Sequence, residues 1–194
     1  MRIIAGEFRG RKLLPPEGDV TRPITDRVKQ SLFDILSPRI EGARVYDCFA
    51  GTGSMGLECL SRGATHATFF EADRSALIRL GTNIQTLKLA DRATIRKGDL
   101  FGHLASPPIS AKADLLFLDP PYRFLREQPQ ALVTLADHVA RLHLNPDALI
   151  VFRHDANDHL ALPPLSVVDQ REYGGMVLEF MQAQVPQSDI RNPQ

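Results

Sequence analysis

The sequence predicts an α/β fold in which a mostly parallel β-sheet ends in an antiparallel hairpin. Segments typical of strands and helices alternate from Arg44 onward, as they do in βαβ units. A glycine-rich turn joins the first of these strands to the helix that follows it. Two β-prone runs, 165–173 and 176–181, flank Gly174 and Gly175, a two-residue signal for a hairpin turn. A fold built only of βα units would more often continue with another helix.

The size and composition of the chain fit one globular domain. Its 194 residues are 43% hydrophobic and 24% charged, and their formal net charge is zero. No apolar run approaches the roughly 20 residues of a membrane-spanning helix, and the first residues lack the apolar core of a signal peptide. We therefore expect a cytoplasmic protein, and we take it to be a monomer. Cys48 and Cys59 form no C-x-x-C pair, so neither a disulfide framework nor a zinc site is expected.

The first 30 residues carry more basic than acidic side chains. Seven basic residues stand against four acidic ones in a segment rich in glycine and proline: Arg2, Arg9, Arg11, Lys12, Arg22, Arg27 and Lys29 against Glu7, Glu17, Asp19 and Asp26. Short apolar pieces over 2–14 favour a β-hairpin or an extended arm rather than a helix. Considered alone, this local excess of positive charge indicates a solvated surface arm.

A helix is expected after the arm. Thr25 can cap it at Asp26, apolar residues then recur at helical spacing, and Pro38 stops it. This helix would pack one face on the main domain and leave Arg27 and Lys29 near solvent. The expected organisation is therefore a basic extension, a main domain and a flexible polar tail: residues 1–40, 41–184 and 185–194.

Five strands and three helices are expected in the main domain before the terminal hairpin. Apolar runs predict strands over 44–49, 67–71, 93–97, 114–119 and 148–153. Helical periodicity predicts helices over 54–62, 74–87 and 129–142, the second of them capped by Asp73. The fourth strand is apolar on both faces, as a strand buried inside a parallel sheet should be.

Residues 45–56 organise the rest of the chain. A short apolar strand contains Asp47 and is followed by Gly51, Gly53 and Gly56 in G-x-G-x-x-G spacing. Glycine permits positive φ and lets a ligand approach the backbone, but the glycine pattern alone equally suits a dinucleotide enzyme. Asp47, near the carboxyl end of its strand, would repel a pyrophosphate and attract a cation. This favours S-adenosylmethionine, which carries a sulfonium and an ammonium group.

Four acidic residues lie at or just beyond the ends of successive strands. They are Asp47, Glu71, Asp99 and Asp119. Ligands of open α/β sheets bind outside these strand ends. Glu71 is placed to accept from both hydroxyls of a ribose, and Asp99 to accept from the amino group of adenine. One such carboxylate usually caps the next helix, but four at one edge beside a glycine loop favour a pocket for a nucleoside and a sulfonium.

A second informative stretch follows the fourth strand and reads Asp119, Pro120, Pro121 and Tyr122. The two prolines fix φ and remove two backbone donors, which leaves a rigid loop of carbonyl and carboxylate acceptors beside an aromatic ring. Such a loop suits the exocyclic amine of a flat base, which offers N–H groups and a face for stacking. The alternative is a Pro-Pro turn that leaves a buried strand, with Tyr122 only packing.

The four-residue loop matches the [D/N]-P-P-[Y/F] signature of amino-group methyltransferases. Residues 2–13, 21–29 and 47–53 carry a more specific similarity, which extends to about Met181. In these residues the chain resembles the bacterial RsmD family of 16S ribosomal RNA guanine-N2 methyltransferases. The resemblance implies a seven-stranded Rossmann-like class I methyltransferase, S-adenosylmethionine as cofactor, and a guanine of small-subunit ribosomal RNA as target, within a ribosomal particle.

The resemblance also implies three groups of site residues. The cofactor-binding group is Asp47, Phe49, Ala50, Gly51, Thr52, Gly53, Glu71 and Asp99. The target-base group is Asp119, Pro120, Pro121 and Tyr122, with Asp119 and the Pro120 carbonyl positioning the amine and Tyr122 stacking on the base. The group facing ribosomal RNA is Arg9, Arg11, Lys12, Arg22 and Arg27. Arg22 and Arg27 have an alternative role, which is to order the loop over the cofactor.

Three other functions compete with this interpretation. A DNA adenine-N6 methyltransferase would use the same four-residue loop, but the chain has no evident separate domain for target recognition. A non-catalytic RNA-binding assembly factor would keep only a relic pocket. A dinucleotide oxidoreductase is disfavoured by Asp47 and by the terminal hairpin.

No histidine spacing indicates a metal site. Cys48 is interpreted as an unreactive residue of the pocket wall, because its surroundings raise the pKa of a thiol.

Overall fold

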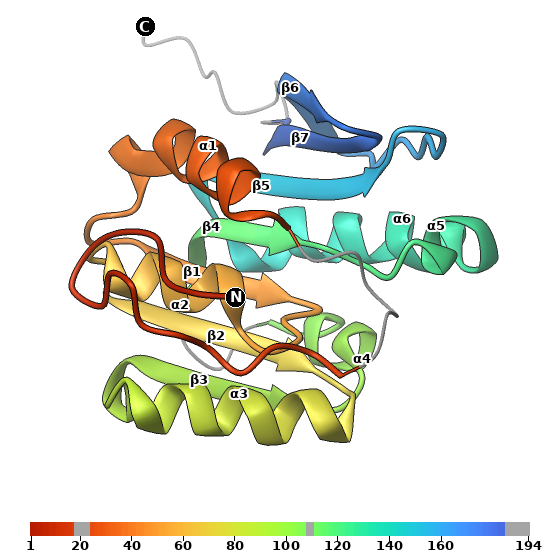
Figure 1. Ribbon diagram of the computed structural model, residues 1–194. Coiled ribbons are helices and arrows are strands. Elements are labelled where there is room, and N and C mark those ends of the chain that lie inside the picture. Colours follow the sequence, from red (N-terminus) through yellow and green to blue (C-terminus); the bar gives the residue numbers. More distant parts are fainter. Residues whose placement is uncertain (18–23, 108–110, 185–194) are drawn as a thin grey trace, which may run out of the picture.

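A computed structural model describes residues 1–17, 24–107 and 111–184 of the chain (Figure 1). Its centre is a seven-stranded sheet in the order β3-β2-β1-β4-β5-β7-β6. The strands are β1 Arg44–Cys48, β2 His66–Glu71, β3 Ala93–Lys97, β4 Ala113–Leu118, β5 Leu144–Asp155, β6 Leu165–Tyr173 and β7 Met176–Ala183. The first five are parallel, whereas β7 runs antiparallel to both β5 and β6. The predicted mostly parallel sheet with its terminal hairpin is confirmed.

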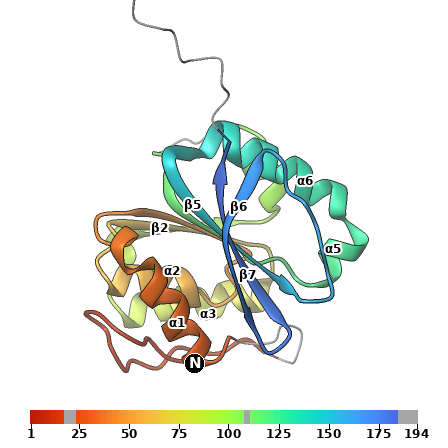
Figure 2. The same ribbon diagram turned by 90° about the horizontal axis from the view of Figure 1, so that it is seen from above.

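Helices cover both faces of this sheet, as Figure 2 shows from above. They are α1 Asp26–Leu36, α2 Ser54–Ser61, α3 Arg74–Thr86, α4 Leu100–Leu104, α5 Arg123–Glu127 and α6 Pro129–His138. Residues of α1, α2 and α3 share one hydrophobic cluster with one face of the sheet, and residues of α4, α5 and α6 share a second cluster with the other face. Strand β4 serves both, because Leu115 and Phe117 belong to the first cluster while Leu116 and Leu118 belong to the second.

Helix α1 starts where the sequence predicts. The Thr25 hydroxyl accepts a hydrogen bond from the Val28 amide at 3.3 Å, and a short 3₁₀ turn containing Pro38 follows the helix. Arg27 is exposed, but the expectation that Lys29 also lies near solvent is wrong. Lys29 is 1% exposed, because its ammonium group pairs with a buried carboxylate on α2.

Two short helices were not predicted from the sequence. Helices α4 and α5 contain five residues each, too few to show a helical period. The last predicted helix also ends earlier than 142, because α6 passes into a π turn, Val139–His143, directly before β5. Both short helices lie at the carboxyl ends of strands, so they line the site described below.

The first residues form a folded-back arm on α2. The chain folds back beside α2 (Figure 1), and Arg2 and Lys12 form an antiparallel bridge. Ile3 and Leu13 are buried in the same cluster as residues of α1 and α2. Gly6 meets α2 so closely that a Cβ there would lie 1.9 Å from the Ser61 carbonyl oxygen.

The predicted division of the chain into a basic extension, 1–40, and a main domain, 41–184, stays a prediction. The predicted flexible tail, 185–194, lies outside the described residues.

Candidate functional site

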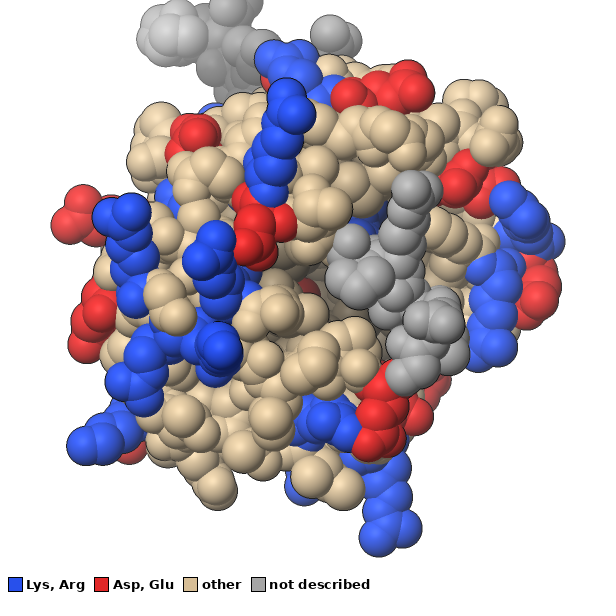
Figure 3. Space-filling model, viewed as in Figure 1, with Lys and Arg blue, Asp and Glu red and all other residues tan. Residues whose placement is uncertain are grey.

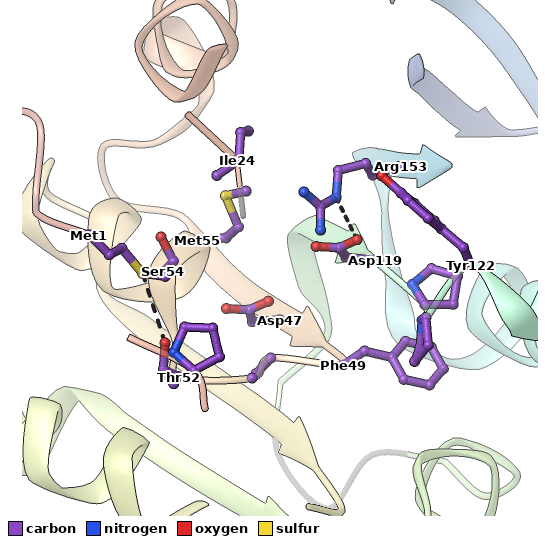
Figure 4. A pocket seen from close by; sticks show the side chains of 15 residues that line it. Met1, Ile24, Asp47, Phe49, Thr52, Ser54, Met55, Asp119, Tyr122 and Arg153 are labelled. Carbon is purple, nitrogen blue, oxygen red and sulfur yellow. Dashed lines mark hydrogen bonds and ion pairs between the residues drawn. The ribbon is translucent and has the colours of Figure 1, made fainter. Parts of the chain in front are cut away.

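Two adjoining hollows lie beyond the carboxyl ends of the central strands. The larger has a volume of about 540 Å³, within the range of roughly 300–1,000 Å³ that is usual for small-molecule sites. The smaller, of about 110 Å³, is shown in Figure 4. Both are lined by Pro16, Phe49, Gly51, Asp119 and Pro121, so these five residues form a shared wall. A ligand in the larger hollow would therefore meet a second ligand in the smaller one at that wall.

The glycine loop between β1 and α2 forms one side of both hollows. Gly53 has a φ of 86°, and a Cβ at this position would lie 2.5 Å from Leu80 Cδ1. Phe49 adopts a φ of 61°, which is rare for a residue with a side chain and marks local strain. Its ring packs edge to face against Phe124 at 5.6 Å and against Phe101 at 6.3 Å. The loop backbone is thus held in one conformation from several sides.

Asp47 is the most deeply buried carboxyl group of the site. It is 2% exposed, lines the smaller hollow, and accepts a hydrogen bond from the Gly56 amide at 2.9 Å. Burial raises the pKa of Asp47 to about 8, with smaller contributions from the negative charges of Asp119 and Glu71. The hydrogen bond from Gly56 opposes this rise. Without a cationic ligand, Asp47 is therefore mostly protonated at neutral pH, and a cation in the hollow would favour its carboxylate.

Glu71 and Asp99 both line the larger hollow and both bind backbone amides. The Glu71 carboxylate accepts from the amides of Gly51 at 2.6 Å, Ala72 at 2.8 Å and Asp73 at 2.7 Å. Glu71 thereby ties the glycine loop to the turn between β2 and α3.

Asp99 caps helix α4, because its carboxylate accepts from the amides of Phe101 at 3.2 Å and Gly102 at 3.1 Å. A carboxylate offers about four acceptor positions, so these bonds leave capacity at both residues for a ligand. The ribose and adenine roles of Glu71 and Asp99 stay predictions.

The loop after β4 lies across the shared wall. Asp119, Pro120, Pro121 and Tyr122 all line the smaller hollow. Pro120 is buried and Tyr122 is half-buried, and the Pro121 carbonyl accepts from the Phe124 amide at 2.8 Å, which starts α5. The predicted target-base residues are therefore together, next to the predicted cofactor residues.

Arg153 is a site residue that the sequence analysis missed. Its Nε donates to Asp119 Oδ1 at 2.6 Å, and it lines the smaller hollow (Figure 4). The signal was present in the sequence, since an arginine ends the otherwise apolar run 148–152 at the carboxyl end of a strand. A charge at that position of a buried strand points to a partner or a ligand.

Asn83 is a second missed residue, and it joins the arm to the glycine loop. Its side-chain amide donates to the Thr52 carbonyl at 3.0 Å and accepts from the Leu14 amide at 2.8 Å. Asn83 is 3% exposed, so these bonds are shielded from water. The arm also supplies Met1, whose sulfur accepts from the Thr52 hydroxyl at 3.8 Å. Residues far apart in sequence thus hold the loop that the sequence predicts to bind the cofactor.

Four of the predicted RNA-facing residues are described, and they line neither of the two hollows. Arg9, Lys12 and Arg27 are exposed, and Arg11 donates to the Thr86 carbonyl at 3.3 Å. Arg9 and Arg27 line a third hollow together with Arg2. Figure 3 shows basic side chains gathered on this face over the arm and α1. Arg22 lies outside the described residues.

Three further features bear on the expectations from sequence. Cys48 is fully buried in the core with Tyr46 and Phe70, which corrects its assignment to the pocket wall, and burial raises the pKa of its thiol. Within residues 1–17, 24–107 and 111–184, no three His, Cys, Asp or Glu side chains are grouped as a metal site would require. Across the same ranges, no helix is long and apolar enough to cross a membrane.

Comparisons with known proteins place these features in a family. A family model described as "Conserved hypothetical protein 95" matches residues 1–182. Ribosomal RNA small subunit methyltransferase D of Haemophilus influenzae is 39% identical over 165 residues, which cover 84% of this chain and 83% of that protein. The protein of the same name from Escherichia coli K12 is 44% identical over 123 residues, which cover 63% of this chain and 61% of that protein.

The fold is also close to that of a solved relative. The structure of yhhF from Escherichia coli superposes with a TM-score of 0.81 at 35% identity. The superposition covers 95% of this chain and 98% of that one. The two structures therefore correspond over nearly the whole of each chain.

Proposed function

Because the chain belongs to the RsmD family, the one described as "Conserved hypothetical protein 95", we propose that it methylates a guanine of small-subunit ribosomal RNA. The methyl group would pass from S-adenosylmethionine to the exocyclic N2 amine of that guanine. The fold is that of class I methyltransferases. The proposed partner is 16S ribosomal RNA, offered in an assembling or assembled small-subunit particle. Such a substrate implies a cytoplasmic enzyme, which we take to be a monomer.

The observation that carries this proposal is the shared wall between the two hollows. The larger hollow has the volume of a nucleoside site and contains Glu71 and Asp99. The smaller hollow contains the acceptor loop that ends in Tyr122. A donor nucleoside and an acceptor base bound side by side would meet at Asp119, which lines both hollows. Holding two reactants in contact in this way supplies a large part of the rate of a transfer reaction.

The residues around the glycine loop fit S-adenosylmethionine. When bound, this cofactor supplies a methyl group activated by a sulfonium. The buried Asp47 would ionise toward the cationic half of the cofactor, since its raised pKa reflects burial without enough compensating positive charge. The amides and carbonyls of residues 49–53 would follow the cofactor closely, because Gly51 and Gly53 carry no Cβ.

On the acceptor side, Asp119 and the Pro120 carbonyl would accept from the amine, and Tyr122 would stack on the base. The target base must be unstacked to enter, either from a loop or by flipping out. Arg9, Arg11, Lys12, Arg22 and Arg27 would neutralise phosphates and set the orientation of the RNA.

The test is transfer of labelled methyl from S-adenosylmethionine to three substrates side by side. These are naked 16S ribosomal RNA, small-subunit particles that lack the modification, and duplex DNA. The expected product is N2-methylguanine in the RNA or in the particles. N6-methyladenine in DNA would instead identify an adenine methyltransferase. Absence of label on all three, with the cofactor bound, would contradict the proposal and favour a binding protein.

A further inference from the structure

Arg153 and Asp119 are neighbours because of the pairing between β4 and β5. Leu118 of β4 lies opposite Phe152 of β5, so the next residue of each strand meets the other at the sheet edge. Their ion pair, 2.6 Å between Arg153 Nε and Asp119 Oδ1, is shielded, since the side chains are only 10% and 20% exposed.

The guanidinium is held from a third strand. Its Nη1 donates to the Met176 sulfur at 3.8 Å, and Arg153 pairs with Leu178 of β7 in the sheet. Burial lowers the pKa of Arg153, but the charge of Asp119 and the hydrogen bond to it raise the pKa above its ordinary value. Arg153 is therefore a permanent, fixed cation beside Asp119.

The other charged or titratable groups around Asp119 cannot replace this cation. Asp47 of β1 also lines the smaller hollow, and its buried carboxyl senses the charge of Asp119. Tyr122 follows in the same loop, and Arg123 lines the larger hollow, where its guanidinium lies 5.8 Å from the Phe124 ring centre. Arg153 is the cation that contacts the Asp119 carboxylate among the described side chains.

We propose that Arg153 is a positioning residue for the methyl transfer proposed above, and that its ion pair holds the Asp119 carboxylate in place as the hydrogen-bond acceptor of the target amine. The inference rests on that proposed function. Methylation of an exocyclic amine forms one N–C bond, breaks one S–C bond, and requires the amine nitrogen to lose one proton. Transfer of the amine proton to Asp119 would neutralise the carboxylate and break its ion pair with Arg153. The amine proton therefore goes to water. Asp119 orients the amine and does not act as its base.

The test compares Arg153→Met and Arg153→Lys with Arg126→Met. Arg126 is a matched control, because it pairs with Asp158 at 2.8 Å outside both hollows. The Asp119 carboxyl carbon is followed by NMR at one fixed pH, with Asp119→Asn to assign the signal. Activity is followed as kcat and as KM for RNA, and cofactor affinity by calorimetry.

In Arg153→Met, we expect the Asp119 carboxyl signal to shift, because the carboxylate loses the guanidinium that holds it. The kcat at pH 7 should fall about 10- to 100-fold because the acceptor is no longer held in place. KM for RNA and the cofactor dissociation constant should stay within about twofold, since binding elsewhere is intact. Arg153→Lys should recover part of kcat, and Arg126→Met should match the wild type.

An unchanged Asp119 carboxyl signal in Arg153→Met would overturn the inference, as would a kcat loss that only follows a loss of folded protein. The NMR measurement needs no turnover, so it separates this inference from the proposed function. If the wild type transfers no methyl to any RNA and the Asp119 signal still shifts in the variant, the proposed function fails and the contact by which Arg153 holds Asp119 is upheld.

Discussion

Lys29 of α1 and Glu58 of α2 form an ion pair at 3.0 Å, with side chains that are 1% and 0% exposed. The Glu58 carboxylate also accepts from the amides of Ile4 at 2.8 Å and Ala5 at 3.0 Å. Arg62 donates to the same carboxylate at 2.8 Å. One buried acid thus joins the arm, α1 and α2, the helix that follows the glycine loop.

Removal of Lys29 should destabilise the whole fold. In Lys29→Met, Glu58 keeps Arg62 but loses the more deeply buried of its two cations, and we expect a loss of about 3 kcal/mol of unfolding free energy, as for other broken buried ion pairs. Urea unfolding measures this loss. Arg171→Met serves as control, because its pair with Asp169 is exposed and should contribute less than about 1 kcal/mol. Equal free energies of unfolding for the two variants would show that the buried ion pair stabilises the fold no more than the exposed pair does.

Cofactor binding should release protons near neutral pH. Asp47 has a pKa of about 8 without a cation nearby, so it binds a proton at pH 7 and should lose it when a sulfonium or ammonium group enters. Affinity should therefore rise with pH up to about 8 and level off above it.

The release is measurable by calorimetry in phosphate and in Tris, whose ionisation enthalpies differ. Asp47→Asn should abolish the buffer dependence and weaken binding. The same heat in both buffers for the wild type would mean that Asp47 does not change its protonation when the cofactor binds.

Tyr122→Ala should cripple turnover while cofactor affinity stays within about threefold. A base that stacks on an aromatic ring gains about 1–3 kcal/mol, so we expect kcat/KM to fall by about 5- to 150-fold. Tyr122 lies in the loop after β4, whereas the predicted nucleoside-binding residues Glu71 and Asp99 line the larger hollow, which Tyr122 does not line. Tyr173→Phe is the control, because Tyr173 is the last residue of β6 and lines neither hollow. An equal loss of cofactor affinity in Tyr122→Ala would contradict this division of roles.

Asn83→Ala should weaken cofactor binding although Asn83 lies outside both hollows. The change leaves the buried Thr52 carbonyl without its donor and frees the arm at Leu14, which should cost about 1–3 kcal/mol of stability. We expect the cofactor dissociation constant to rise about five- to tenfold. Calorimetry on folded protein measures it, with the exposed Asn157→Ala as control. An unchanged constant would show that the arm does not position the loop.

The sequence alone determined the order of the elements and the edge at which the site lies. Local rules suffice for this, because each signal depends only on neighbours in the chain. The signals are the helix caps at Thr25 and Asp73, the apolar residues on both faces of β4, and the glycine turn. Parallel strands end at one edge, so the carboxylates that follow them had to gather there. The short helices α4 and α5 were missed because five residues carry no period.

Only the tertiary structure decided which side chains meet. The β4–β5 register brings Arg153 to Asp119, and the packing of α1 on α2 buries Lys29, which its own helix would have left in solvent. The pKa of Asp47 is likewise set by burial and by charges from other strands. These properties depend on distances between residues remote in sequence, and such distances exist only once the chain is folded.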